Sequence, residues 1–481
     1  MTEPSTLSAR NLKNDLVLPT LLFAALGAMS WAVRGSSGYG GSDGCIFAGV
    51  LWGTAWWFIA REPRAVQSRR YTSGWIILAM MVGFGISGNR GWAQWSSMFE
   101  GRLQTNTAAG EYVSILPVYG FVWLFIAGVP WAGIGACMLA WCGDAWKPRG
   151  SREWVIWCGK WVLRIGSGYA GVRLAQYLFV EYPNVFLPLY TLHEGRYNDL
   201  EANSNLGRMI NDNRAAITHL GLYLGFLAFE FARRDWKNVL LIAAVGLING
   251  VGWSVQQNWM WANELWPNVA FNWWRSWESC GGISIGVALG VAYFLVNRPV
   301  TDAERAKLGE QLTNRWPNLE RFGAYFGLLI GVGFSIRNGL KGWANLYLGN
   351  EDYWSGVLWK IIGPLMILGF ILMVLRILMR CVRVESTDDM DMVDAVDMRD
   401  TEAAAVQSKT HDQKSKMNLV FPHAYVITWL VLIIMNILAQ LATKSFGHWP
   451  ETVFAFYYAA LFVFTGMIIR HYHKMKNASR E

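Results

Sequence analysis

Five polar side chains occupy equivalent places in the sequence, each near the end of an apolar run and six or seven residues after a glycine. They are Arg34, Arg90, Arg173, Gln256 and Arg337. The steps between the last four are 83, 83 and 81 residues, which indicates that one structural unit has been duplicated. An Arg within or beside the hydrocarbon layer is costly unless it faces a cavity or a partner. We therefore interpret the set as a candidate substrate-binding site.

Arginine suits the recognition of anions, because its planar guanidinium donates two parallel hydrogen bonds to a carboxylate or phosphate. If the five helix ends converge, they would form one anion-binding cavity that opens to the outside. The alternative interpretation is structural. An Arg at the end of a span can extend to the interface or pair with a carboxylate such as Asp43, Glu100 or Glu278. The sequence leaves both interpretations open.

The predicted binding set has five further members close to these helix ends. They are Asn338, Trp343, Lys360, Arg275 and Glu278. Asn338 directly follows the last repeat position, Trp343 lies six residues beyond that position, and Lys360 is expected to be a buried cation inside the next span. Arg275 and Glu278 lie three residues apart in a Trp-rich stretch, so they can pair on a helix.

A separate titratable segment, from Glu181 to His219, offers candidates for acid–base chemistry. The catalytic residues remain unassigned, and the candidates are His193, Glu194 and His219, because His near a carboxylate suits proton transfer. The spacing matches no metal motif, and no nucleotide or cofactor fingerprint occurs in the sequence. We therefore expect neither a metal nor a cofactor. The alternative interpretation of this segment is an exposed loop helix with paired charges.

The elements that carry these residues are apolar. Hydrophobic residues make up 53% of the 481-residue chain and charged residues only 16%, whereas a soluble protein carries about a quarter charged residues. Apolar runs of about 18 to 25 residues recur, each long enough to cross a bilayer. We predict about twelve spans, near residues 16–34, 44–60, 74–90, 117–142, 156–178, 215–232, 238–256, 280–297, 322–338, 356–380, 420–440 and 451–470. The expected fold class is an all-α polytopic membrane protein built from repeated two-helix hairpins.

Positive charge divides the connections between spans into two classes. Lys and Arg are concentrated after the second, fourth, sixth and eighth spans and in the C-terminal tail. With twelve spans these connections all fall on one side, and the positive-inside rule makes that side the cytoplasm. Both termini are then cytoplasmic, and Glu230 near the inner end of its span is expected to pair with Arg233 or Arg234. These loops account for the formal charge of +8, so we expect no nucleic-acid partner.

Composition divides the chain into five parts. Residues 1–15 are expected to form a cytoplasmic N-terminal segment, and residues 16–380 a ten-helix bundle of five repeated hairpins. Acidic residues crowd the first half of 381–418, which has few large apolar residues, and we interpret it as a flexible cytoplasmic linker. Residues 419–470 form a final helix pair, and residues 471–481 a cytoplasmic tail.

Glycines recur at four-residue spacing within several predicted spans. The longest cases are Gly282, Gly286 and Gly290 in one span and Gly323, Gly327 and Gly331 in another. This spacing places small residues on one helix face and lets helices approach closely in lipid. It predicts a compact bundle without indicating a function.

The leading functional hypothesis is a transporter or channel-like protein that binds a small polar, anionic solute from the outer face. One alternative is a membrane-embedded enzyme that acts on a lipid-linked or glycan substrate at the outer leaflet. Another is a structural or assembly subunit whose Trp-rich loops dock a partner protein. The expected partners are the lipid bilayer and the solute, and the sequence is compatible with a homo-oligomer or a membrane-protein partner. The expected location is the plasma membrane, which in a bacterium is the inner membrane.

Overall fold

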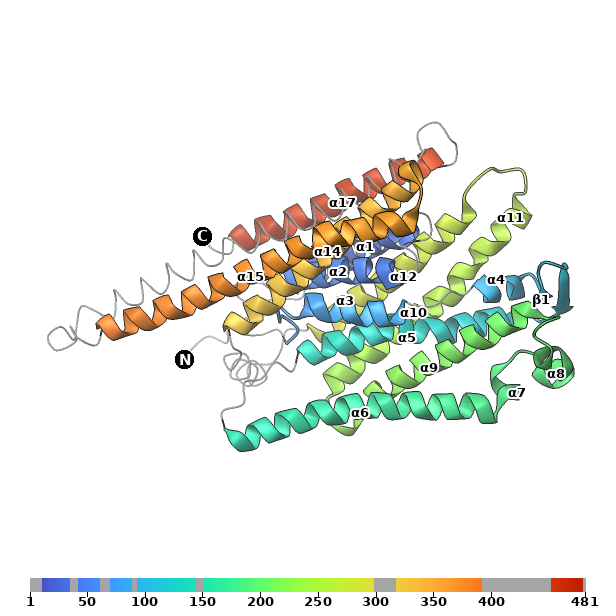
Figure 1. The fold of residues 1–481 in the computed structure, drawn as a ribbon, viewed down its shortest axis with the longest axis horizontal. Helices are drawn as coiled ribbons and strands as arrows, with labels where there is room; N and C mark the ends of the chain where they lie inside the picture. Colours follow the sequence, from blue (N-terminus) through green and yellow to red (C-terminus); the bar gives the residue numbers. More distant parts are fainter. Residues whose placement is uncertain are drawn as a thin grey trace.

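The computed structural model describes residues 11–34, 42–60, 70–88, 93–143, 150–297, 317–391 and 451–478. Within these ranges most of the chain is helical, and the long helices run side by side along the longest axis of the molecule (Figure 1). Eight helices are long and apolar enough to cross a membrane, and two shorter apolar helices accompany them. The chain is therefore an all-α, multi-pass membrane protein.

The bounds of the elements follow in chain order. The first part of the described chain contains η1 (Lys13–Val17), α1 (Leu18–Arg34), α2 (Ser42–Ala60), α3 (Ile76–Ser87), α4 (Ala93–Phe99), β1 (Arg102–Asn106), β2 (Glu111–Ser114), α5 (Val118–Cys142), α6 (Ser151–Glu181), α7 (Pro183–Phe186) and α8 (Tyr190–Asn198). The second part contains α9 (Ser204–Ala232), α10 (Trp236–Gln256), η2 (Gln257–Trp261), α11 (Ala262–Leu265), α12 (Trp273–Val296), α14 (Pro317–Leu348), α15 (Glu351–Asp391) and α17 (Glu451–Ala478).

The predicted spans coincide with helices wherever the chain is described. The span expected at 420–440 lies outside the described residues, as does most of the linker expected at 381–418. α6 has the length of a span but is not among the eight helices apolar enough to cross a membrane. The reason is its charge, because Lys160, Arg164 and Arg173 all lie within it.

Tryptophan rings fill the centre of the bundle. The ring of Trp31 in α1 lies 5.9 Å from that of Trp52 in α2 and 5.4 Å from that of Trp131 in α5, between centroids. The Trp131 ring lies 4.9 Å from the ring of Trp253 in α10. All four side chains are buried, so helices from distant parts of the chain share one aromatic core.

Glycines bring the helix backbones into direct contact around this core. A Cβ atom on Gly282 of α12 would lie 2.0 Å from the carbonyl oxygen of Gly27 in α1. One turn further along α12, a Cβ on Gly286 would lie 2.3 Å from the carbonyl oxygen of Phe23. These positions therefore have no room for a side chain, and the prediction that the four-residue glycine spacing allows close helix approach is confirmed here.

The connection between α3 and α5 contains a short helix and a β-hairpin. After α4, strands β1 and β2 pair antiparallel, with Arg102 opposite Ser114. The turn holds Gly110 at a φ of +72°, which glycine adopts without steric cost. The amide of Thr107 donates to Asn205 Oδ1 at 2.8 Å and ties the hairpin to the start of α9. We call this end of the bundle, with β1, β2, α7 and α8, the hairpin end.

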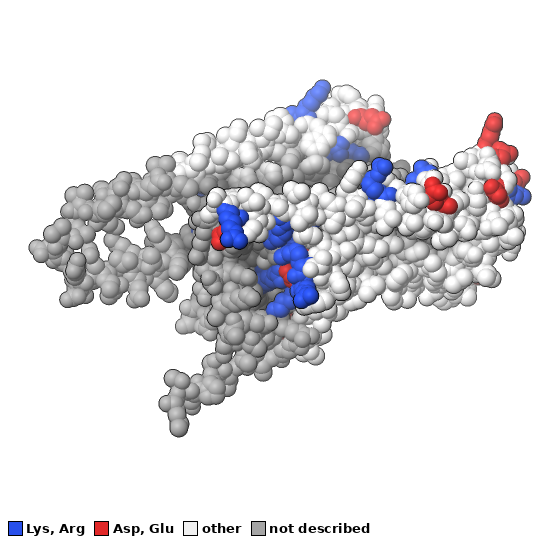
Figure 2. All heavy atoms as spheres, turned by 90° about the horizontal axis from the view of Figure 1, so that it is seen from below, with Lys and Arg blue, Asp and Glu red and all other residues white. Residues whose placement is uncertain are grey.

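At the opposite end of the bundle, α6 begins and a turn joins α9 to α10. We call this end the basic end. Figure 2 shows Lys and Arg gathered there, more charge toward the hairpin end, and a largely uncharged stretch of surface between. The start of the chain and its last described helix meet at the basic end, because Tyr472 donates from its hydroxyl to the carbonyl oxygen of Asn14 at 2.6 Å.

Candidate functional site

A fully buried ion pair joins α6 to α9 at the basic end. Arg164 Nε donates to Glu230 Oε1 at 2.7 Å, and Arg164 Nη2 lies 2.5 Å from the same oxygen. Both side chains are 0% exposed. The Arg164 guanidinium also lies over the rings of Trp141 and Trp161, at 5.1 and 5.2 Å. Such burial of charge in a membrane bundle is costly, and it is retained only where the charges are well paired.

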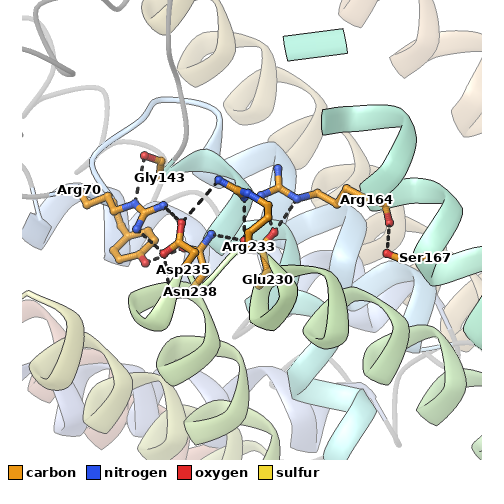
Figure 3. A network of polar contacts seen from close by, with 9 residues as sticks. Arg70, Gly143, Arg164, Ser167, Glu230, Arg233, Asp235 and Asn238 are labelled. Atoms are coloured by element: carbon orange, nitrogen blue, oxygen red, sulfur yellow. Dashed lines mark hydrogen bonds and ion pairs between the residues drawn. The ribbon is translucent and has the colours of Figure 1, made fainter. Parts of the chain in front are cut away.

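The second oxygen of Glu230 extends this pair into a network (Figure 3). Glu230 Oε2 accepts from Arg233 Nη1 and from Asn238 Nδ2, each at 2.9 Å. The expected pairing of Glu230 with Arg233 is therefore confirmed. A neighbouring pair continues the network, because Arg70 Nη1 donates to Asp235 Oδ1 at 2.6 Å and its Nη2 contacts the other carboxylate oxygen.

The network suits a structural lock better than a proton relay. Glu230 binds two guanidinium groups and one amide, so both of its oxygens already accept charge-assisted or amide hydrogen bonds. Residues from before α3, from α6 and from the α9–α10 turn are thereby tied together at one level (Figure 3). We infer that the network fixes how these helices sit at the basic end.

Three of the predicted binding residues lie at the hairpin end, where α10 meets α12. Gln256 ends α10, and its Oε1 atom would lie 2.9 Å from a Cβ on Gly281 of α12. Arg275, in the first turn of α12, lies over the Phe454 ring of α17 at 5.2 Å. Glu278 is one turn further along α12, and both Arg275 and Glu278 are buried. We call Gln256, Gln257, Arg275, Glu278 and Ser279 the α12 cluster.

The α12 cluster contains polar atoms whose hydrogen-bonding needs are not met. The side-chain oxygens of Gln256 and Gln257 are buried and have no hydrogen-bond partner among the described residues. By contrast, Ser279 shares a hydrogen bond of 2.9 Å with the hydroxyl of Tyr457 in α17. The α12 cluster thus lies among α10, α12 and α17, and the surrounding residues satisfy only part of its hydrogen-bonding capacity.

Arg337 and Asn338 both lie in α14, which packs against α15. The buried Arg337 guanidinium lies over the Trp359 ring at 5.1 Å, donates to Asn338 Oδ1 at 2.7 Å and contacts the Ser355 hydroxyl. The amide nitrogen of Asn338 is buried and lacks a partner within the described part of the chain. Trp343 is 42% exposed and packs on Tyr347.

The expectation that Lys360 is a buried cation is wrong. Its side chain is exposed, because α15 lies at the edge of the bundle. Only 6% of the residues in the apolar stretch of this helix are buried. Arg173 is likewise exposed, on α6. The described repeat residues Arg173, Gln256 and Arg337 therefore sit in three different helix pairs. The side chain of Arg34 and the whole of Arg90 lie outside the described residues.

The candidates for acid–base chemistry lie on separate elements. His193 stands at a kink inside α8, with φ −132°, and Glu194 beside it is exposed. His219 lies in α9 and lines a pocket between α6 and α9 together with Gln176 and Arg214. His193 and Glu194 are thus carried by α8, and His219 by α9. The charges nearby pair on the surface, as Arg196 does with Glu111 at 3.7 Å.

Sequence analysis did not identify most of the residues of the basic-end network. Arg164 was missed because a span is located by the average hydropathy of many residues, which one charged residue changes little. A lone Arg inside an apolar run nevertheless indicates a buried partner or a cavity. In the sequence, Arg70 and Asp235 resemble ordinary charged loop residues, because 165 residues separate them and only the fold brings them together. No family model matches the sequence, and the comparisons with curated proteins and with solved structures found no match.

Proposed function

We propose that the protein is an integral membrane transport protein that binds a small polar, anionic solute at the α12 cluster. The observation that carries this proposal is the pair of buried, unpartnered side-chain oxygens of Gln256 and Gln257. A buried polar group without a partner costs about 1–3 kcal/mol. A solute that donates hydrogen bonds to these oxygens, through hydroxyl or amine groups beside its anionic group, would remove that cost. Gln256 is also one of the positions that the sequence repeat predicts.

Arg275 is the group of the cluster that would recognise an anionic group on the solute, and Glu278 balances its charge within the cluster. Arg275 is buried on the same end of α12, and a guanidinium in low-dielectric surroundings binds carboxylates and phosphates strongly. The side chains of Ser279 and Tyr457 add hydroxyl groups that can accept or donate. The Trp31 ring lies beside Gly281, where Gln256 also approaches, and both Trp31 and Trp277 are buried.

The topology that we propose has about twelve spans, arranged as repeated two-helix hairpins with both termini in the cytoplasm. The positive charge of the basic end supports the orientation, since the positive-inside rule places that end in the cytoplasm. The solute would then reach the α12 cluster from the outer face. The plasma membrane, in a bacterium the inner membrane, remains the proposed location.

A transport assay on reconstituted protein tests the proposal. Purified protein in liposomes is presented with a panel of labelled small carboxylates, phosphates and sulfonates, and uptake is measured at solute concentrations below KM. We expect Gln256→Leu to lower uptake of the transported anion about tenfold, as the loss of about 1.4 kcal/mol of binding predicts. The same change should leave the melting temperature unchanged or raise it, because it removes an unsatisfied polar group.

Asn258→Leu is the matched control, because Asn258 is exposed two residues further along the chain. It makes the same chemical change outside the cluster, so uptake should stay within twofold of the wild type. Equal uptake by the Gln256→Leu variant and the wild type would contradict the proposed site. Failure of every anion in the panel to accumulate would contradict the transport function itself.

A further inference from the structure

A polar groove opens between α6 and α9 near the hairpin end. Its volume is about 230 Å³, room for several water molecules at about 30 Å³ each. It is lined by Gln176, Asn211, Arg214, Ala215, Thr218 and His219. Five of these six side chains are polar, although they lie where two long helices of a membrane bundle face each other.

The groove exists because the two helices touch on one side of it and separate on the other. A Cβ on Gly171 of α6 would lie 2.1 Å from the carbonyl oxygen of Gly221 in α9. One turn deeper, a Cβ on Gly225 would lie 2.2 Å from the carbonyl oxygen of Ser167. Thr218 and Gln176 lie about one turn beyond this contact toward the hairpin end, where the larger residues hold the helices apart.

Positive charge and hydrogen-bond donors dominate the groove. Arg214 lies over the Phe179 ring at 5.5 Å, and no carboxylate of the described residues lies within 4 Å of its guanidinium. The amides of Gln176 and Asn211 make no side-chain hydrogen bond within the described part of the chain, so their NH₂ groups are available to a ligand. No Asp or Glu lines the groove. A ligand with several anionic oxygens matches this set of donors.

The surroundings of the groove are apolar and face outward. Leu174, Tyr177 and Val180 on the same stretch of α6 are 58%, 58% and 66% exposed. Gln176 lies five residues before the end of α6, about 8 Å of helix, whereas Thr218 and His219 lie near the middle of α9, so the groove runs from the hairpin end toward the centre of this helix pair. Arg173 is exposed on the preceding turn of α6 and adds a second cation close to the groove.

We propose that the α6–α9 groove binds a phosphate group, with Arg214 as its main anchor and Gln176, Asn211 and His219 as further hydrogen-bonding groups. The phosphate belongs either to a lipid head group, whose acyl chains lie along the exposed apolar residues of α6, or to a water-soluble phosphate compound. The site is lined by α6 and α9 alone, so it does not depend on the solute proposed for the α12 cluster.

A binding experiment on the full chain in lipid-depleted detergent micelles separates these sources. Three probes are titrated and followed by isothermal calorimetry: short-chain phosphatidylglycerol, inorganic phosphate, and diacylglycerol as a lipid without phosphate. We expect phosphatidylglycerol to bind at least tenfold more tightly than diacylglycerol. Arg214→Gln should weaken that binding about tenfold or more, because it removes a charge-assisted contact.

Arg208→Gln is the matched control, since Arg208 lies on the same helix, pairs with Asp212 and does not line the groove. It should change the affinity less than twofold. Asn211→Leu provides a second test if Arg214→Gln does not fold, because Asn211 is exposed and Leu would fill the groove.

Binding of phosphatidylglycerol without binding of inorganic phosphate supports the lipid head group, and comparable binding of both supports a soluble phosphate compound. Two results would overturn the proposal. One is diacylglycerol binding as tightly as phosphatidylglycerol. The other is wild-type affinity for phosphatidylglycerol and for inorganic phosphate in folded Arg214→Gln or Asn211→Leu protein.

Discussion

Replacing Glu230 by Leu should destabilise the protein more than replacing Arg164 by Met, although the two side chains form one ion pair. Glu230 accepts hydrogen bonds from Arg164, Arg233 and Asn238, so its loss removes three contacts at once. Without Arg164, by contrast, Glu230 keeps the other two. Both side chains of the pair are fully buried, and removing one partner of such a pair costs about 3–5 kcal/mol.

We therefore expect a loss of about 3–5 kcal/mol in the free energy of unfolding for Glu230→Leu and a smaller loss for Arg164→Met. The double variant should be less destabilised than Glu230→Leu alone, because it no longer leaves the Arg164 charge buried without the carboxylate. Unfolding in mixed micelles with increasing dodecyl sulfate, followed by far-UV circular dichroism, gives these free energies. Arg152→Met and Glu181→Gln are the controls, since both residues are exposed on α6.

Two results would refute this reasoning. Equal losses for the two single variants would mean that Arg233 and Asn238 do not hold Glu230 as the geometry requires. Additive losses in the double variant would mean that Arg164 is stabilised by its aromatic neighbours and not by the carboxylate.

Two further predictions concern packing and pH. Gly282→Ala should lower the melting temperature, by the equivalent of about 1–3 kcal/mol or more, because its Cβ would meet the Gly27 backbone, whereas Gly159→Ala on α6, with open space around it, should not. Burial raises the pKa of Tyr197 well above its usual range, so the folded state favours the protonated hydroxyl, which donates to the carbonyl of Pro188 at 2.7 Å. Stability should therefore be intact below about pH 10 and fall as pH rises further, and Tyr197→Phe should remove that part of the alkaline loss in a pH series of thermal melts.

The sequence predicted best those features that depend on local periodicity. Runs of apolar residues located the helices, and the spacing of Gly282 and Gly286 located a face where another backbone approaches. Both follow from the geometry of a single helix. The partner of that face is α1, more than 200 residues earlier in the chain, and no local pattern names it.

Features that depend on which helices become neighbours were not predictable in this way. The sequence suggested that Arg173, Gln256 and Arg337 face one cavity, because their positions in the repeat are equivalent. Equivalent positions in the sequence do not fix where a residue lies in its helix: Gln256 ends α10, whereas Arg173 and Arg337 lie eight and eleven residues before the ends of α6 and α14. The rotation of each helix then decides what its side chains meet. Arg173 meets the surface, whereas Gln256 meets α12 and Arg337 meets α15. The exposure of Lys360 has the same origin, because only the assembled bundle makes α15 an edge helix.

The two buried polar clusters differ in a way that bears on how a solute would cross. At the basic end Glu230 is saturated by two guanidinium groups and an amide, and opening that network would cost about 3–5 kcal/mol. At the hairpin end the amide oxygens of Gln256 and Gln257 are buried but unsatisfied, so a polar ligand there lowers the free energy instead of breaking contacts. Under the proposed function, binding is therefore favoured at the hairpin end, while the seam of α6, α9 and α10 stays closed.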